Sequence, residues 1–246
     1  MKQYFQAFAM CQSMFCAIPS PFRVWEEKAR DKMLLFLPLV GLEIGLMWAL
    51  AAWAVRLLAL PGTVAGVVCC ACPWLLTGFI HLDGYMDVTD AVRSYRSLER
   101  RREILKDSHV GSFAVIGLVL LALSQYGLFA AAPAGADFRI LALVPVMSRC
   151  GSALAVTMLR PMSTSQYAAR RTRPGYVAAL VLQAAAALAA GFLLCGRYGF
   201  ALMGCLAGYG LALLRGYRSL QGMNGDLAGY ALTWAELAGV AVYALL

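Results

Sequence analysis

The sequence predicts an all-α integral membrane protein, a single polytopic bundle of about seven transmembrane helices over residues 1–246. Hydrophobic residues make up 61% of the chain and charged residues only 14%, whereas a soluble domain carries about a quarter charged residues. The mean hydropathy of +0.70 indicates the same class. The apolar residues also form long blocks, and a helix needs about 20 of them to cross the hydrocarbon core.

The apolar blocks divide the chain and leave no room for a sizeable soluble domain. They cover residues 33–58, 62–80, 110–132, 138–159, 177–195, 198–214 and 228–246. Residues 1–32 precede the first block and lack the small-residue cleavage site of a signal peptide. We expect this N-terminal segment to be cytoplasmic or interfacial, either as an interfacial helix or as a re-entrant piece.

Basic residues orient the predicted spans. The formal net charge is +8, and Lys and Arg gather in residues 2–32, 81–109, 160–176 and 215–226, whereas the alternate connections hold only isolated charges. The positive-inside rule then predicts a cytoplasmic N-terminus and a C-terminus on the far side. Topology and anionic lipid headgroups account for the basic excess, so we expect membrane lipids as partners and no nucleic acid.

The connection 81–109 contains three carboxylates in a helical pattern. Asp83, Asp87 and Asp90 are spaced i, i+4 and i+7, within an arc of roughly 60° on a helix. Carboxylates on one face repel one another unless a cation lies among them, and Mg²⁺ takes such oxygen ligands while keeping positions open for substrate phosphates. The pattern predicts a metal-binding face; the alternative is a solvated acidic face at the membrane surface.

The rest of this connection also contains candidate phosphate contacts. Residues 81–91 are expected to continue a helix past the second span, and residues 92–106 to form an amphipathic helix whose arginines contact either headgroups or substrate phosphates. Asp107 and Ser108 then precede the third span. Either residue could simply cap the helix of the third span. The alternative is a phosphate site, because free N–H groups at a helix N-terminus that follows an acidic residue can bind the oxygens of a metal-bound phosphate.

Ionisable residues inside predicted spans form a further group of candidates. Glu43, Arg149 and Glu236 are such residues, and a charge there is costly unless it pairs or faces water. Arg149 and a Glu either bind substrate or pair to hold helices together. Before the last span, Asn224 and Asp226 flank a glycine, and a capping aspartate would explain Asp226 alone.

The predicted distribution of acids favours an enzyme. The acidic residues of 81–109 and Asp226 fall on the predicted cytoplasmic side, and Asp137 alone lies on the other. A transporter would place polar groups along a path through the bilayer, so a phosphate-bearing substrate handled at the cytoplasmic face is the better interpretation. The sequence has no phosphate-binding glycine loop, dinucleotide fingerprint or nucleophile elbow.

Five blocks of the chain resemble one known family, adenosylcobinamide-GDP ribazoletransferase, also called cobalamin synthase. In chain order they are Leu37-Pro38-Leu39-Val40-Gly41, His81-Leu82-Asp83-Gly84 with Asp87 and Asp90, Lys106-Asp107-Ser108-His109-Val110-Gly111, Ser148-Arg149 with Gly151, and Asn224-Gly225-Asp226 with Gly229 and Glu236. The second and third blocks together are specific. The chain departs from the family pattern at Ala91, Cys150 and Thr233, and none of these removes a carboxylate of the set.

The resemblance implies a reaction, a cofactor and a location. Such an enzyme transfers the adenosylcobinamide phosphoryl group from adenosylcobinamide-GDP to α-ribazole or its 5′-phosphate, releases GMP and forms adenosylcobalamin or its 5′-phosphate, with Mg²⁺ as cofactor. The expected location is the bacterial or archaeal cell (inner) membrane, with the active site facing the cytoplasm. The oligomeric state is left open.

On this resemblance, Asp83, Asp87 and Asp90 are expected to be catalytic and to hold Mg²⁺, with Asp107 completing the metal site and Asp90 accepting the proton of the attacking hydroxyl. Arg149 and the arginines of 93–102 would neutralise phosphate charge. The expected substrate-binding residues are His81, Gly84, Ser108, Gly111, Arg149, Asn224, Asp226 and Glu236.

Two other functions remain as alternatives from the sequence. A CDP-alcohol phosphotransferase also displaces a nucleotide with membrane aspartates and metal, but it expects Ala-Arg where this chain has Asp87-Val88. A transporter of a cation or small solute would take up its substrate without consuming nucleotide.

Overall fold

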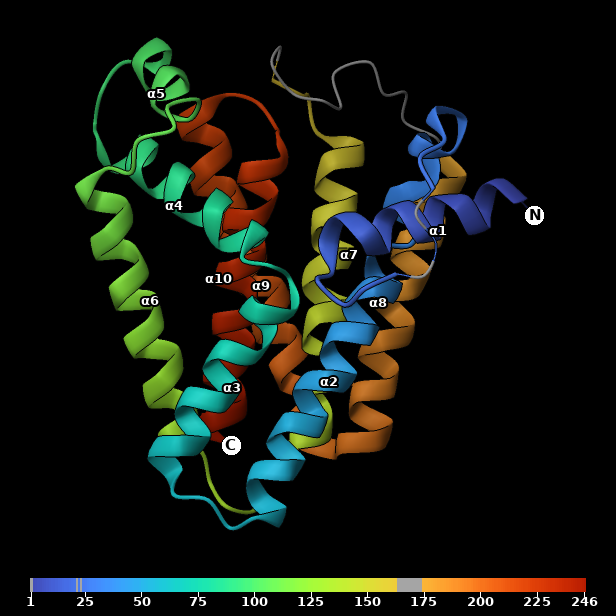
Figure 1. Cartoon of the computed structure of the whole chain (residues 1–246), viewed down its shortest axis with the longest axis vertical. Helices are drawn as coiled ribbons and strands as arrows, with labels where there is room; N and C mark the ends of the chain where they lie inside the picture. Colours follow the sequence, from blue (N-terminus) through green and yellow to red (C-terminus); the bar gives the residue numbers. More distant parts are fainter. Residues whose placement is uncertain (1, 21, 23, 163–173) are drawn as a thin grey trace.

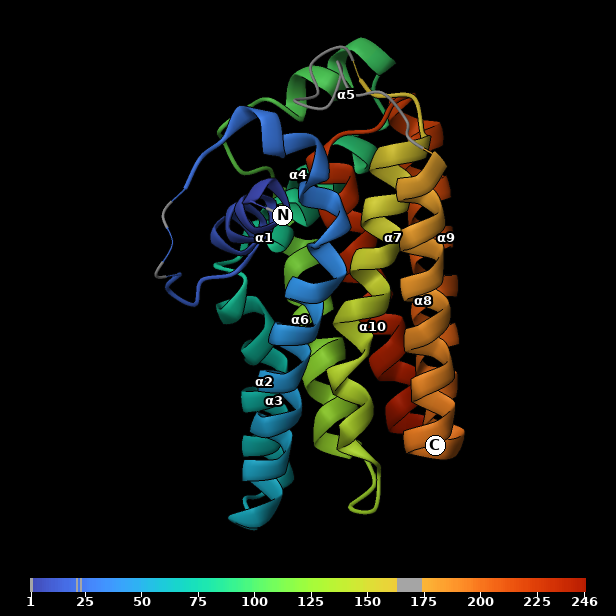
Figure 2. The same ribbon diagram turned by 90° about the vertical axis from the view of Figure 1, so that its right-hand side faces the viewer.

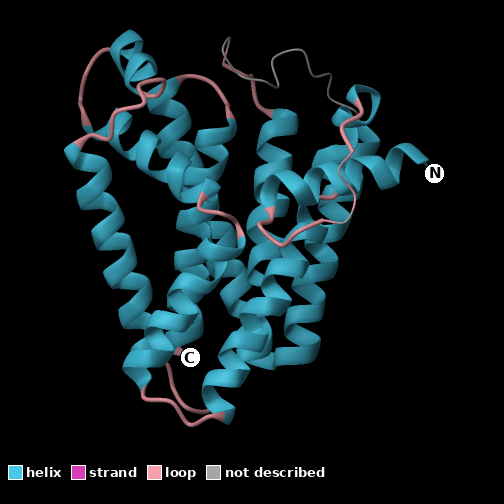
Figure 3. Cartoon of the chain, viewed as in Figure 1, coloured by secondary structure: helices cyan, strands magenta, loops and turns pink. Residues whose placement is uncertain are grey.

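The computed structural model describes residues 2–20, 22, 24–162 and 174–246. Over these residues the chain is helical and has no β-strand (Figure 3), which confirms the predicted all-α class. The elements, with η for a 3-10 helix, are α1 (Lys2–Phe15), η1 (Glu27–Leu35), α2 (Leu37–Leu57), α3 (Gly62–Leu76), α4 (Ile80–Arg93), α5 (Leu98–Ile104), α6 (Ser112–Ala131), η2 (Phe138–Ala142), α7 (Val144–Met158), α8 (Pro174–Cys195), η3 (Gly196–Gly199), α9 (Phe200–Leu220) and α10 (Gly225–Leu245).

Most of the long helices have the dimensions of membrane spans. Among the described residues, five helical stretches are long and apolar enough to cross a membrane, and a sixth is added if the bent pair α3 and α4 forms one span. One of the five, Pro174–Leu220, contains both α8 and α9, and the chain turns back between them at η3 (Figure 1). The arrangement is that of a polytopic membrane bundle.

The connections gather at the two ends of this bundle. α5 and the α9–α10 connection lie at one end, and the α2–α3 connection, the α6–η2 connection and the C-terminus lie at the other (Figures 1 and 2). We call the first the α5 end. The described segments that were predicted to be cytoplasmic are therefore separated from those predicted on the far side. Of the basic residues behind that prediction, Arg23, Arg170, Arg171 and Arg173 lie outside the described residues.

The predicted second span, 62–80, breaks before its end. α3 ends at Leu76, and α4 begins at Ile80 at an angle of 94° to α3. Gly78 and Phe79 have φ of 58° and 64°, in the left-handed region that only glycine adopts readily. Residues 81–91 are helical, as predicted. They do not continue the helix of the second span, because Gly78 and Phe79 break it and turn the chain.

Pro73 lies within α3, and a side chain of α2 compensates for it. Proline has no N–H, so the carbonyl four residues earlier loses its helical hydrogen bond. The indole Nε1 of Trp48 donates to that carbonyl, of Cys69, at 2.7 Å. Trp48 is fully buried, so this hydrogen bond fixes α3 against α2 just before the bend.

The N-terminal segment contains a helix that lies across the bundle. α1 crosses the direction of the long helices in both views (Figures 1 and 2). The Gln12 side chain donates to the carbonyl of Ile18 at 3.1 Å, and the Ala17 N–H donates to the carbonyl of Leu76 at 2.7 Å. The segment is therefore bound to the end of α3, beside the bend that starts α4.

The α2–α7 side of the bundle packs through glycine. A Cβ at position 45 would overlap the carbonyl of Ala142, and one at position 41 would lie 2.8 Å from the Cδ of Arg149. Small residues on one face let membrane helices approach closely, where dispersion contacts replace the hydrophobic effect. Gly41 and Gly45 are one turn apart and therefore set the close contact of α2 with the chain around η2 and α7.

We expect Gly45→Ala to destabilise the bundle, because the added methyl overlaps the backbone of Ala142. Overpacking of this kind costs about 1–3 kcal/mol. The matched control is Gly127→Ala in α6, where a Cβ meets no atom within 4 Å. Unfolding of the full chain in detergent measures both, and equal stability of the two variants would contradict the packing argument.

Candidate active site

The predicted acidic face lies on α4. Asp83, Asp87 and Asp90 project from one side of this single helix, Asp83 exposed and the other two half-buried. The Asp87 carboxylate is within electrostatic range of Asp83, Asp90 and Asp226. Four negative charges therefore share one region near the α5 end, and Asp226 is contributed by a different helix, α10.

The start of α10 is packed directly against α4. A Cβ on Gly84 would lie 2.9 Å from both the Cα and the carbonyl oxygen of Asp226, so only glycine permits this approach. Asn224 caps α10: its Oδ1 accepts from the N–H of Leu227 at 2.9 Å, and its Nδ2 donates to Asp226 at 2.6 Å. The Asn-Gly-Asp segment thus orients the Asp226 carboxylate beside the acidic face.

The start of α6 meets the other end of the acidic face. A Cβ on Gly111, the N-cap of α6, would overlap the carboxylate of Asp90. Further along, the Tyr85 hydroxyl donates to the carbonyl of Gly117 at 3.1 Å. These contacts place the Asp90 carboxylate at the N-terminus of a helix, where the free N–H groups and the helix dipole favour negative charge.

Asp107 and Ser108 lie in the exposed connection before α6. Asp107 Oδ1 accepts from the His109 N–H at 3.0 Å and lies 2.7 Å from its Nδ1. These contacts hold the pKa of Asp107 below its usual value, the backbone hydrogen bond having the largest effect. His109 and Arg100 are the charged groups that help to lower the pKa of Asp107. The prediction that Asp107 completes the metal site stays a prediction.

The carboxylates can hold a cation only together with a ligand. Among the described residues, no group of three or more His, Cys, Asp or Glu side chains lies close enough to enclose a metal ion. Mg²⁺ sites in phosphoryl-transfer enzymes use one or two carboxylates, and substrate phosphates and waters supply the other oxygens. The Asp83, Asp87, Asp90 and Asp226 set has the donor chemistry for such a shared site.

A small cavity adjoins the acidic face. It has a volume of about 140 Å³ and lies between α1, α4, α7 and α10, with Asp83, Asp226 and His81 on its polar side and Phe15 and Val156 among its apolar residues. The Phe15 and His81 rings stack with centroids 6.1 Å apart. His81 Nε2 is buried and has no hydrogen-bond partner among the described residues, so it is available to a ligand.

Sequence reasoning did not single out Phe15, Val156 or the role of α1 in this cavity. Each contributes an ordinary apolar side chain, and only the transverse position of α1 brings residues so distant in sequence together. The backbone of His81 is held by α10, because the Thr233 hydroxyl donates to its carbonyl at 3.3 Å.

Comparison with known proteins identifies the family. A family model described as cobalamin-5-phosphate synthase matches residues 7–244. This chain belongs to the cobalamin-5-phosphate synthase family. The resemblance stated from the sequence motifs is thereby confirmed.

Relatives of this family member cover nearly its whole length. An adenosylcobinamide-GDP ribazoletransferase of Clostridium perfringens (strain 13 / Type A) is 35% identical over 245 residues, 98% of each chain. That of Lachnoclostridium phytofermentans is 35% identical over 243 residues, 94% of this chain and 90% of the relative. That of Clostridium botulinum (strain Alaska E43 / Type E3) is 29% identical, covering 98% and 97%. No solved structure matches significantly.

Two predicted substrate-binding residues of this family member form an ion pair inside the bundle. Arg149 of α7 and Glu236 of α10 are 0% and 5% exposed, and Arg149 Nη1 lies 2.8 Å from Glu236 Oε1. The Ser148 hydroxyl also donates to this Glu236 oxygen, at 3.0 Å. Arg149 and Glu236 contact each other and do not line the cavity beside Asp83, as the helix-pairing alternative expects. Arg149 Nε and Nη2 have no partner among the described residues, so a ligand contact stays open for them.

The arginines of 93–102 separate into different environments. The helix predicted over 92–106 is in fact shorter, because α4 continues to Arg93 and α5 covers only Leu98–Ile104. Arg101 and Arg102 donate to carbonyls at the end of α9, those of Ser219, Leu220 and Gln221. Cations are favoured at a helix C-terminus, so these two arginines bind α5 to α9.

We expect Glu236→Gln to destabilise this family member by about 3–5 kcal/mol, because it leaves the buried Arg149 charge without its partner. The matched control, Arg149→Met with Glu236→Leu, removes both charges and should recover most of that loss. Denaturant titration in detergent measures the stabilities. Unchanged stability of Glu236→Gln with a raised KM for the acceptor would instead support a substrate-binding role.

Proposed function

We propose that this chain catalyses the reaction for which its relatives are named, the transfer of the adenosylcobinamide phosphoryl group from adenosylcobinamide-GDP to α-ribazole or its 5′-phosphate, with release of GMP. The observation that carries the proposal is the grouping of Asp83, Asp87, Asp90 and Asp226 at one end of a membrane bundle, in a chain whose family match runs over residues 7–244. That match favours this reaction over a CDP-alcohol phosphotransferase or a transporter.

The bonds that change define what the site must do. The acceptor hydroxyl attacks the phosphorus that bears cobinamide, the phosphorus–oxygen bond to GMP breaks, and the hydroxyl proton must be taken up. Asp83 and Asp87 would hold Mg²⁺, which when bound would supply positive charge to offset the negative charge on the phosphoryl oxygens. Asp90 is the proposed proton acceptor, because its carboxylate is held in place against Gly111.

The cavity beside the acidic face has a size that suits the flat base of the acceptor. An α-ribazole consists of an aromatic base joined to a ribose, so one end of the molecule is apolar and flat and the other is polar. The cavity of about 140 Å³ has Phe15 and Val156 among its apolar residues and Asp83 and Asp226 on its polar side. A base placed between the apolar residues would direct the ribose toward the carboxylates, with His81 Nε2 available for a hydrogen bond.

The location follows from the same orientation argument. We place the α5 end at the cytoplasmic face of the bacterial or archaeal cell membrane, because the basic segments of the sequence gather there. The acidic face is near this end (Figure 1), which gives it access to water-soluble nucleotide substrates.

We expect Asp87→Asn to lower the rate of GMP release by roughly 10²-fold or more. The substitution removes a proposed carboxylate ligand of the Mg²⁺ that would stabilise the negative charge of the transition state. Membranes containing the full chain are incubated with adenosylcobinamide-GDP, α-ribazole 5′-phosphate and Mg²⁺, and GMP is quantified. EDTA should stop the wild-type reaction. The matched control is Asp137→Asn. Asp137 lies just before η2 and forms an ion pair with Arg139. Wild-type turnover by folded Asp87→Asn, or turnover in EDTA, would contradict the proposed metal face.

We expect Val156→Phe to raise the KM for α-ribazole 5′-phosphate by roughly 10-fold, because the added ring occupies part of a cavity whose fit is worth about 1–3 kcal/mol. The KM for adenosylcobinamide-GDP should change little. The same substitution at the exposed Val115 of α6 is the control. Equal effects on both substrates, or none, would exclude the cavity as the acceptor site.

A further inference from the structure

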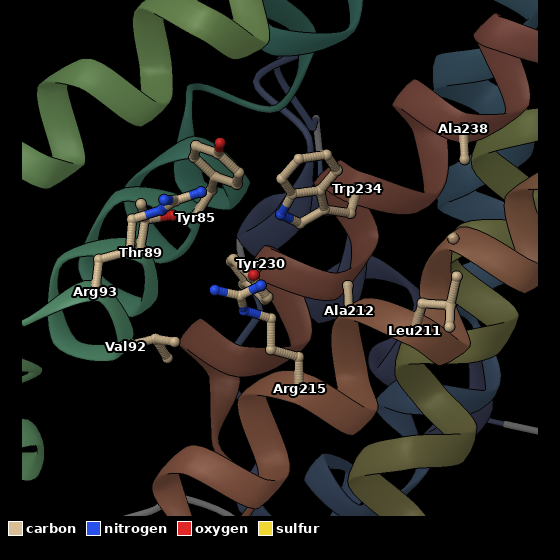
Figure 4. A pocket seen from close by; sticks show the side chains of 11 residues that line it. Tyr85, Thr89, Val92, Arg93, Leu211, Ala212, Arg215, Tyr230, Trp234 and Ala238 are labelled. Carbon is tan, nitrogen blue, oxygen red and sulfur yellow. The ribbon is translucent and has the colours of Figure 1, made fainter. Parts of the chain in front are cut away.

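A second and larger hollow lies on the reverse side of α4. It has a volume of about 390 Å³ and is bounded by α4, α9 and α10 (Figure 4). Tyr85, Thr89 and Arg93 of α4 line it at helical spacing. Tyr85 and Thr89 lie on the side of α4 opposite to Asp83 and Asp87, and Arg93 lies between the two sides. The helix itself therefore separates this groove from the acidic face.

Two arginines from different helices point into the groove. In Figure 4 the guanidinium of Arg215 lies beside Tyr230 and that of Arg93 beside Tyr85 and Thr89. Both are within electrostatic range of the Tyr230 hydroxyl. Neither forms an ion pair or hydrogen bond with another described residue. Two unpaired positive charges that line one hollow favour an anion there, and guanidinium groups fit phosphate geometry.

The rest of the groove is apolar and continues onto the lipid-facing side of α9. Leu211, Ala212, Ala238 and Trp234 line it. Leu211 is 71% exposed, and the neighbouring surface of α9 exposes further large apolar side chains, those of Met203, Leu206 and Leu214. A ligand that follows this surface needs a hydrocarbon body as well as an anionic head, which inorganic phosphate lacks.

We propose that this groove binds one anionic phospholipid, with its phosphate between Arg93 and Arg215 and an acyl chain along Leu211 and Ala238. Basic pockets between membrane helices on the cytoplasmic side suit such headgroups. The lipid would contact the Tyr85 and Thr89 side of α4 and bridge α4 to α9. This site is separate from the proposed reaction, and its test does not depend on that activity.

The test compares phosphatidylglycerol with phosphatidylcholine on the purified full chain in detergent. Native mass spectrometry and thermal unfolding, each with lipid added, report retention and stabilisation. We expect selective retention of phosphatidylglycerol by the wild type, and a roughly 10- to 30-fold weaker affinity for it in the double variant Arg93→Gln with Arg215→Gln. The control variant, Arg96→Gln with Arg218→Gln, removes two exposed arginines that do not line the groove and should behave as the wild type.

If the double variant does not fold, a second pair of variants tests whether phosphatidylglycerol binds in the groove. Leu211→Glu places a carboxylate one turn before Arg215 and should compete with the phosphate, whereas Leu211→Gln should not. Equal retention of both lipids by the wild type would overturn the proposal, as would undiminished phosphatidylglycerol binding in Leu211→Glu. Stabilisation by inorganic phosphate or α-ribazole 5′-phosphate equal to that by phosphatidylglycerol, and lost with the arginines, would show an anion site without a lipid.

Discussion

The close packing of α10 against α4 holds four mutually repelling carboxylates in one region. Three of them are on α4, and the packing keeps the fourth, Asp226 of α10, beside them. The contact depends on Gly84, whose missing side chain lets the backbone of Asp226 approach α4. Asn224 then fixes the first turn of α10. The repulsion itself is useful chemistry, since a site with uncompensated negative charge binds a cation that also binds a diphosphate. Packing between helices therefore maintains an electrostatic arrangement that the isolated side chains would avoid.

The direction of α4 follows from the bend before it. Gly78 and Phe79 turn the chain by 94° after α3, so the acidic helix does not extend straight out of the second span. The segment after α1 binds the end of α3 through Ala17 and Leu76, and the end of α1 forms one wall of the cavity beside Asp83. The N-terminal segment, the bend and the start of α10 together shape the space in which the acceptor is proposed to bind.

Polar groups inside the bundle differ in how far the fold satisfies them. Trp48 satisfies the carbonyl that Pro73 leaves free, because an unpaired polar group is costly where no water is present. Arg149 pairs with Glu236 through Nη1, but its Nε and Nη2 are buried without a partner among the described residues. Arg93 and Arg215 lack such partners and line a groove, and Asp83 lines the cavity beside the acidic face. Whether a charge has a partner inside the fold thus distinguishes the residues that hold helices together from those available to ligands.

The sequence by itself determined the membrane class, the positions of most spans, the shared face of Asp83, Asp87 and Asp90, and the family. These depend on composition, helical periodicity and short motifs, which are local. Only the tertiary structure decided that Asp226 joins the acidic face, that Arg149 pairs with Glu236, and that α4 turns away from α3. Such contacts join residues far apart in the chain, and they depend on where small side chains let helices approach, which no local pattern specifies.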